Sequence, residues 1–179
     1  MTALPAGVVD VPVALVSDGD YLPSLLGLIE QARARIDCSL FMIDLSPGPG
    51  GVLAADDVLQ ALARAAWRGV RVRLLLGGSR ENLDILQACT AAWLRARALG
   101  LDTRLLASQR RRGSHVKLVI ADDRVLTGSQ NWSHGAFFTQ TQDALLLDSA
   151  DLAAQLGALF AAQWARAARA ARPAPGAVG

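Results

Sequence analysis

The 179-residue sequence is short of lysine, cysteine and aromatic residues. Its two cysteines, Cys38 and Cys89, have no metal-ligand spacing, and we expect them to be small core residues rather than a disulfide. Aromatic residues make up 5% of the chain, so the core must be built mainly from Leu, Val and Ala. A cysteine-based zinc module and a disulfide-rich scaffold are both disfavoured.

Long apolar runs are also missing. No stretch reaches the roughly 18 uncharged apolar residues of a membrane span, because even the Ala-rich C-terminal segment is interrupted, by Asp151, Gln155, Gln163 and Arg166. The first twenty residues contain no basic region and no sustained apolar run before Asp10, so they do not resemble a secretory signal. We therefore expect a cytoplasmic protein without a transmembrane segment.

The overall composition is that of a globular protein, with 52% hydrophobic and 19% charged residues. The length predicts a single domain over residues 1–171, and we expect residues 172–179 to be a disordered tail. The formal net charge is only +2, which does not by itself indicate a polyanionic ligand. Local clustering is more informative, and the one dense basic run is formed by Arg110, Arg111 and Arg112.

The first half of the chain alternates between strand and helix patterns. Three helices are expected here: one with Pro23 in its first turn, one that begins at Asp56 or Asp57, and one over 81–99. Buried strands are predicted at 11–16, 38–45, 70–78 and 102–107. This alternation predicts an α/β fold with a mixed, largely parallel sheet sandwiched between helices on both faces.

The second half of the chain does not continue this alternation of strands and helices. A polar loop is predicted at 108–114, and two strands at 115–121 and 124–128 are joined tightly at Asp122 and Asp123. One further strand is predicted at 143–148. A last helix should run from Asp148 or Ser149 to about residue 171.

The residues that suggest chemistry lie between His115 and Asn131. Lys117 is the one lysine in a chain with seventeen arginines, which suggests a position that needs a compact ammonium. His115 and Lys117 are two residues apart on a predicted strand, so their side chains should project from the same face. An ammonium beside the attacking atom would neutralise the charge of a phosphodiester, and a neutral imidazole is a plausible nucleophile.

Further polar side chains follow the pair. Ser129 and Asn131, again two residues apart, could donate to non-bridging phosphate oxygens. The run from Arg110 to Arg112 precedes His115 directly, and a phosphate-binding role and a solvated loop are equally supported. We expect Trp132 to be a core or pocket-wall residue and His134 to be a solvent-facing loop residue.

The spacing His-x-Lys-x4-Asp followed by Gly-Ser-x-Asn resembles the signature of the phospholipase D superfamily, which includes phospholipases, phospholipid synthases and nucleases. The matching positions are His115, Lys117, Asp122, Gly128, Ser129 and Asn131. The similarity extends over roughly residues 11–165.

The resemblance implies a role for each matching residue. His115 would form a phosphoenzyme intermediate or protonate the leaving oxygen, and Lys117 and Asn131 would bind the phosphate. Asp122 would be mainly structural. Asp143 occupies the place of a family acidic residue, more usually Glu, that hydrogen-bonds the histidine and fixes its tautomer. Gly128, Ser129 and the run from Arg110 to Arg112 would line the substrate site.

These features predict a metal-independent phosphodiesterase that uses no cofactor and acts through a phosphohistidine. We expect a nuclease acting on nucleic acid, as a homodimer with its active site at the two-fold interface, because one motif supplies only one of the two groups that the reaction needs. The first alternative is a phospholipase D or phosphatidyl transferase acting on phospholipids. The second is a non-catalytic dimeric module that binds nucleic acid.

Overall fold

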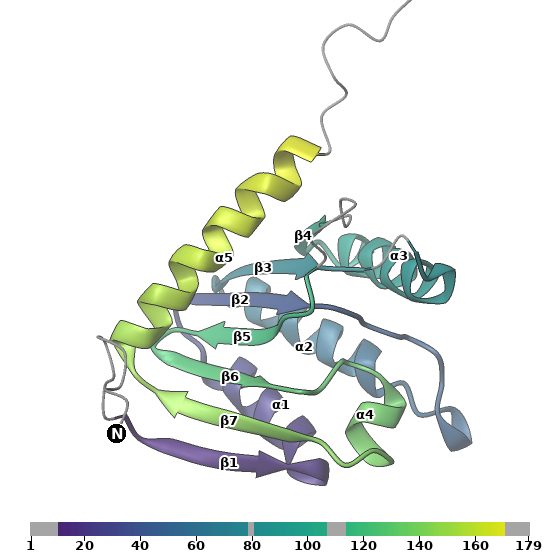
Figure 1. Cartoon of the computed structure of the whole chain (residues 1–179), viewed down its shortest axis with the longest axis horizontal. Helices are drawn as coiled ribbons and strands as arrows, with labels where there is room; N and C mark the ends of the chain where they lie inside the picture. The colour runs from purple at the N-terminus through teal and green to yellow at the C-terminus, as the bar shows by residue number, and fades with distance from the viewer. Residues whose placement is uncertain (1–10, 79–80, 107–113, 171–179) are drawn as a thin grey trace, which may run out of the picture.

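A computed structural model describes residues 11–78, 81–106 and 114–170, which form a seven-stranded sheet flanked by helices (Figure 1). The strands are β1 (Val13–Ser17), β2 (Arg35–Leu40), β3 (Arg71–Leu76), β4 (Asp102–Leu105), β5 (Lys117–Ala121), β6 (Arg124–Gly128) and β7 (Asp143–Asp148). The helices are α1 (Tyr21–Gln31), α2 (Ala54–Trp67), α3 (Leu83–Ala98), α4 (His134–Phe138) and α5 (Ala150–Ala170). Two short 3-10 turns, η1 (Asp18–Asp20) and η2 (Pro49–Gly51), precede α1 and α2.

The strand order in the sheet is β1-β7-β6-β5-β2-β3-β4. The expected mixed α/β fold with helices on both faces is confirmed. The sheet is less parallel than expected, because among the described strands only β2–β3 and β3–β4 are parallel pairs. The other neighbours are antiparallel: β2 with β5, β5 with β6, β6 with β7, and β7 with β1.

One face of the sheet packs against α1 and α2 (Figure 1). The helical positions predicted to face the core are buried there, among them Leu25, Ile29, Val58 and Leu62. Cys38 and Cys89 are both free and buried, as expected of small core residues.

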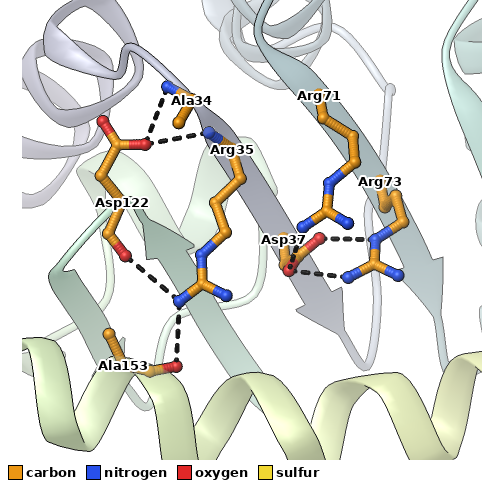
Figure 2. A network of polar contacts seen from close by, with 7 residues as sticks. All are labelled: Ala34, Arg35, Asp37, Arg71, Arg73, Asp122 and Ala153. Carbon is orange, nitrogen blue, oxygen red and sulfur yellow. Dashed lines mark hydrogen bonds and ion pairs between the residues drawn. The ribbon is translucent and has the colours of Figure 1, made fainter.

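The opposite face is crossed by α5, which packs over β2, β4, β5 and β6. Phe160 and Trp164 of α5 lie on the guanidinium of Arg73, at 4.9 and 5.6 Å from their ring centroids. Arg73 in turn donates to both carboxylate oxygens of the buried Asp37, at 2.7 and 2.9 Å (Figure 2). A paired charge under stacked rings therefore fixes this helix on the sheet.

The first predicted strand is present but is not buried. The side chains of Val13 and Leu15 are 57% and 69% exposed, because β1 is the edge strand and pairs with β7 alone.

Two predicted boundaries also differ. β2 begins at Arg35 rather than at residue 38, since the charges of Arg35 and Asp37 interrupt the apolar pattern but have partners in the fold. α2 begins at Ala54, and Asp56 does not cap it. The Asp56 carboxylate accepts instead from Arg95 and Gln60, at 2.7 and 2.8 Å.

Candidate active site

His115 lies just before β5, at the end of the sheet where β2 and β3 terminate (Figure 1). The backbone N–H of Phe41, the residue after β2, donates to the carbonyl of Val116 at 2.8 Å. The ring centroids of Phe41 and His115 are 4.6 Å apart. Sheet pairing thus fixes the backbone of His115, while its side chain stays exposed at the sheet end.

The structure brings Lys117 and His115 together. The Nζ atom of Lys117 lies 3.1 Å from both ring nitrogens of His115 and 3.1 Å from the His115 carbonyl oxygen. An atom this close to both nitrogens must lie over the face of the ring, because a position between them in the ring plane would overlap Cε1. Lys117 therefore leaves the in-plane positions of both nitrogens to other partners, and neither nitrogen has another hydrogen bond within the described ranges.

The environment favours the neutral form of the His115 imidazole. Burial, and then the charge of Lys117, lower the pKa of His115 below its ordinary value of about 6.5. Burial also lowers the pKa of Lys117. The ion pairs found among the described residues leave Lys117 out, and a partly desolvated ammonium without a carboxylate is suited to binding an anion.

Asn131 lies beside the same continuation of β2 as His115. The N–H of Trp132 donates to the carbonyl of Met42 at 3.2 Å, and the N–H of Asp44 donates to the carbonyl of Trp132 at 2.8 Å. The Oδ1 atom of Asn131 is buried and has no hydrogen-bond partner among the residues that the structure describes. His115, Lys117 and Asn131 therefore occupy one end of the sheet.

Gly128 ends β6, and Ser129 follows it beside the start of β7. The Ser129 hydroxyl donates to Oε1 of Gln142 and accepts from the N–H of Asp143 at 3.2 Å. A Cβ atom on Gly128 would overlap the Asp143 carbonyl oxygen and the backbone of Ala144. Only glycine allows the two strands to approach this closely. The predicted substrate contacts of Ser129 and Gly128 stay predictions, and what the structure shows is their packing role.

Asp143 begins β7 and is exposed. Its carboxylate accepts from the Ser17 hydroxyl at 3.3 Å. No hydrogen bond between Asp143 and His115 is present in the described part of the chain, so the expected role of Asp143 in fixing the tautomer of His115 stays a prediction.

Asp122 ties the β5–β6 turn to the start of β2 (Figure 2). Its carboxylate accepts the backbone N–H groups of Arg33, Ala34 and Arg35 at 2.7, 2.9 and 2.9 Å. The guanidinium of Arg35 extends the network, donating at 3.3 Å to the carbonyl oxygens of Asp122 and Ala153. This is a structural arrangement of the kind that the family resemblance implies.

The charge state of Asp122 follows from these contacts. Burial opposes ionisation, but the N–H donors of Arg33, Arg35 and Ala34, together with the charge of Arg124, outweigh it and lower the pKa of Asp122. Asp122 also has a φ of 53°, in the left-handed region that aspartate tolerates in tight turns.

Sequence reasoning missed Phe41. Its ring contacts His115 and lies 5.0 Å from the Lys117 ammonium, measured to the ring centroid. No spacing rule connects residue 41 with residues 115 and 117, because the contact arises from the pairing of β2 with β5.

The predictions for Trp132 and His134 have different outcomes. Trp132 is fully buried and donates from Nε1 to the Tyr21 hydroxyl at 3.3 Å, which confirms a core position. The expectation that His134 is a solvent-facing loop residue is wrong. His134 begins α4 and is half-buried, and its ring lies so close to Gly48 that a Cβ there would overlap it.

Large exposed apolar side chains lie at this end of the sheet. We define the apolar rim as the residues on η2–α2, on α4 and at the start of α3: Val52, Leu53, Phe138 and Leu83. The packing of His134 against Gly48 joins the first two of these segments. α3 follows the end of β3, so the rim lies at the sheet end that carries His115 (Figure 1).

Three further expectations concern the arginine run, metal binding and membrane spans. Arg110, Arg111 and Arg112 lie outside the described residues. Within 11–78, 81–106 and 114–170, no group of three or more His, Cys, Asp or Glu side chains is placed to hold a metal ion. In the same ranges, no helix has the length and hydropathy needed to cross a bilayer.

Comparison with known proteins gives concordant matches. Residues 25–164 match a family model described as the PLD-like domain of cardiolipin synthase. Cardiolipin synthase A of Erwinia tasmaniensis is 28% identical over 172 residues, which cover 84% of this chain and 32% of that protein. The chain therefore spans about a third of the length of this curated relative.

Solved structures share the fold. The phospholipase D family member Nuc from Salmonella typhimurium has a TM-score of 0.70 and 22% identity, over 88% of this chain and 96% of that one. NucT from Helicobacter pylori has a TM-score of 0.65 and 18% identity, over 88% of this chain and 98% of that one.

Proposed function

Because this chain belongs to the phospholipase D superfamily, whose members act on phosphodiester bonds, we propose that it is a metal-independent phosphodiesterase that cleaves nucleic acid as a homodimer. The observation that carries the proposal is the position of the Lys117 ammonium, 3.1 Å from both ring nitrogens of His115. A nucleophile and a phosphate-binding cation are thereby preassembled.

In the proposed reaction, one imidazole nitrogen of His115 attacks phosphorus and the P–N bond forms as the bond to the leaving oxygen breaks. Lys117 and the Asn131 amide bind the non-bridging oxygens, whose negative charge is then balanced. A second group protonates the leaving oxygen. Water next attacks the phosphohistidine and gives its proton to that second group, which releases the phosphate product and restores His115.

The second group is proposed to be the partner subunit's His115. The described part of one chain supplies a single histidine beside Lys117, and the other, His134, packs its ring against Gly48 and Phe138 instead. The apolar rim supports a two-fold contact at this end of the sheet. Such a contact would bury the rim residues of both copies and bring the two half-sites together.

Nucleic acid is proposed as the substrate because the basic run from Arg110 to Arg112 directly precedes His115, and a polyanion binds through repeated phosphate contacts. Phospholipid is the second candidate. It is favoured by the cardiolipin synthase relative and by the apolar rim, which could accommodate acyl chains. A purely binding module is less well supported, since His115, Lys117 and Asn131 are all retained.

The test is a substrate panel in excess EDTA. The purified chain and its His115→Ala variant are incubated with a bis-aryl phosphodiester, with DNA, with RNA and with phosphatidylglycerol vesicles. We expect the wild-type chain alone to hydrolyse the aryl diester and to cut DNA or RNA. Turnover of the vesicles without nucleic-acid cleavage would replace the nuclease by the phospholipid enzyme. DNA binding without turnover of any substrate would support the non-catalytic binding module instead.

A further inference from the structure

Phe41, Lys117 and His115 form a group of three side chains in mutual contact. The centroids of the Phe41 and His115 rings are 4.6 Å apart with the planes tilted by 50°. The Lys117 ammonium lies 5.0 Å from the Phe41 centroid and 3.1 Å from both imidazole nitrogens. Each member therefore restricts the other two.

We propose that Phe41 is a positioning residue, whose ring holds the Lys117 ammonium over the His115 imidazole and keeps the imidazole oriented for attack on phosphorus. This inference rests on the proposed role of His115. Phe41 itself is not proposed to contact the reacting atoms.

The backbone of Phe41 is held on both sides, which fixes the point from which its ring projects. Its N–H donates to the Val116 carbonyl at 2.8 Å, and its carbonyl accepts from the Gly78 N–H at 2.9 Å. The Cys89 thiol donates to the same carbonyl, at 3.4 Å. The backbone that carries the ring is thus anchored to β5, to the end of β3 and to α3.

The ammonium needs such a support. A lysine side chain has four flexible carbons. Among the described residues, the polar contacts of the Lys117 ammonium are with His115, through its ring nitrogens and its carbonyl oxygen. The negative face of an aromatic ring attracts a cation, and the attraction increases when the cation is partly desolvated. A leucine would fill much of the same space but would present no such face.

Holding the ammonium in place also affects the imidazole. The Lys117 charge contributes to lowering the pKa of His115, after the larger contribution of burial. If Phe41 were only an apolar wall, replacing it with another apolar side chain would leave this coupling intact. If its ring positions Lys117, the same replacement weakens the coupling, and the pKa of His115 rises toward its ordinary value.

The experiment compares Phe41→Leu, which removes the ring, with Phe41→Tyr, which keeps it. Trp67→Leu, which removes a ring at the opposite end of the sheet, is the control. Each full-length variant is checked for folding by thermal unfolding. The His115 imidazole is titrated by 1H–15N NMR, and kcat and KM are measured on a bis-aryl phosphodiester. Phe41→Met replaces Phe41→Leu if the leucine variant does not fold.

We expect Phe41→Leu to raise the His115 titration midpoint and to lower kcat by roughly tenfold, the size of a partly buried cation–π contact, with KM changed less. Phe41→Tyr should resemble wild type in both readouts, and so should Trp67→Leu. A folded Phe41→Leu variant with unchanged midpoint and kcat would overturn the inference, as would equal effects of Leu and Tyr. A shifted midpoint in a chain that turns over no substrate would keep the positioning role and reject the proposed function.

Discussion

The Lys117 ammonium lies over the His115 imidazole, 3.1 Å from each ring nitrogen. A positive charge at this position disfavours protonation of the ring, and so does burial, which is the larger cause of the lowered pKa of His115. The attacking, neutral form is therefore present at neutral pH, and activity should fall as the pH drops through the lowered pKa of His115. Because the partner subunit's His115 must carry a proton to protonate the leaving oxygen, activity should fall at higher pH as well, so a pH–rate profile should be bell-shaped.

Lys117→Met tests the contribution of the charge. We expect the pKa of His115 to rise in this variant but to stay below its ordinary value, because burial remains. The measurement is an NMR titration of the imidazole. Turnover should also fall by roughly a hundredfold or more, since a phosphate-binding cation is removed. An unchanged His115 titration would show that the two side chains are not coupled in solution.

His115→Ala should remove activity without affecting the fold. The His115 side chain is exposed at the end of the sheet and belongs to none of the hydrophobic clusters, so the free energy of unfolding should change by less than about 1 kcal/mol. Loss of the nucleophile should reduce kcat by at least ~10³-fold. Urea unfolding and turnover of the aryl diester measure the two effects. A variant that unfolds would assign His115 a structural role instead.

Asp122→Asn should affect stability rather than chemistry. The carboxylate accepts three backbone N–H groups, and an amide would present an NH₂ group to at least one of them. We expect the free energy of unfolding to fall by roughly 1–2 kcal/mol. The loss is kept this small because two of the three hydrogen bonds are solvent-exposed and are therefore weakened by water. Chemical denaturation at pH 7 measures this loss.

The same pair of proteins gives a pH test. The folded state lowers the pKa of Asp122, so its stabilisation is fully present above the unfolded pKa of about 3.9 and is lost as the pH falls through the folded value. The stability difference between Asp122→Asn and wild type should therefore shrink below about pH 4. A difference that stays constant down to pH 2 would show that the carboxylate charge is not what stabilises the turn.

Much of the candidate site could be predicted from the sequence because it follows local rules. The two-residue period of a strand is sufficient to place His115 and Lys117 side by side. Phe41 could not be predicted, since its contact depends on the pairing of β2 with β5 across more than seventy residues of chain.

The missed parts of the fold have similar causes. α4 has five residues and a Ser133 cap, too few for an apolar period to be visible. Asp37 lies in a buried strand only because Arg73, from another strand, neutralises it. Leu15 is exposed because β1 is the edge strand of the sheet, a position that no local pattern encodes.

Metal removal should leave turnover unchanged. Every step of the proposed reaction uses an imidazole, an ammonium or an amide of the chain, so no step calls for a metal-bound water. Turnover of the aryl diester is measured before and after dialysis against EDTA, and again with added magnesium or zinc. Activity lost in EDTA and restored by either ion would contradict the proposed mechanism.

The last prediction concerns assembly. If two copies of His115 share one site, mixing wild-type chains with an equal amount of His115→Ala chains should halve the activity per wild-type chain, because about half of those chains then pair with an inactive partner. Subunit exchange is first confirmed by mass spectrometry of the mixed dimer. Activity per wild-type chain that does not change on exchange would show that each chain carries a complete site.

The apolar rim supplies a second, independent arm of this test. Leu83 belongs to the rim and Leu159 lies on α5, and their side chains are similarly exposed, at 69% and 62%. A charge at a two-fold contact repels its own symmetry copy, so Leu83→Glu should weaken the dimer and lower activity at nanomolar protein, with recovery as the concentration is raised. Leu159→Glu, the matched control, should leave both association and activity unchanged. Sedimentation velocity and turnover are recorded across the same concentration range, and a Leu83→Glu chain that is monomeric yet fully active would refute the shared site.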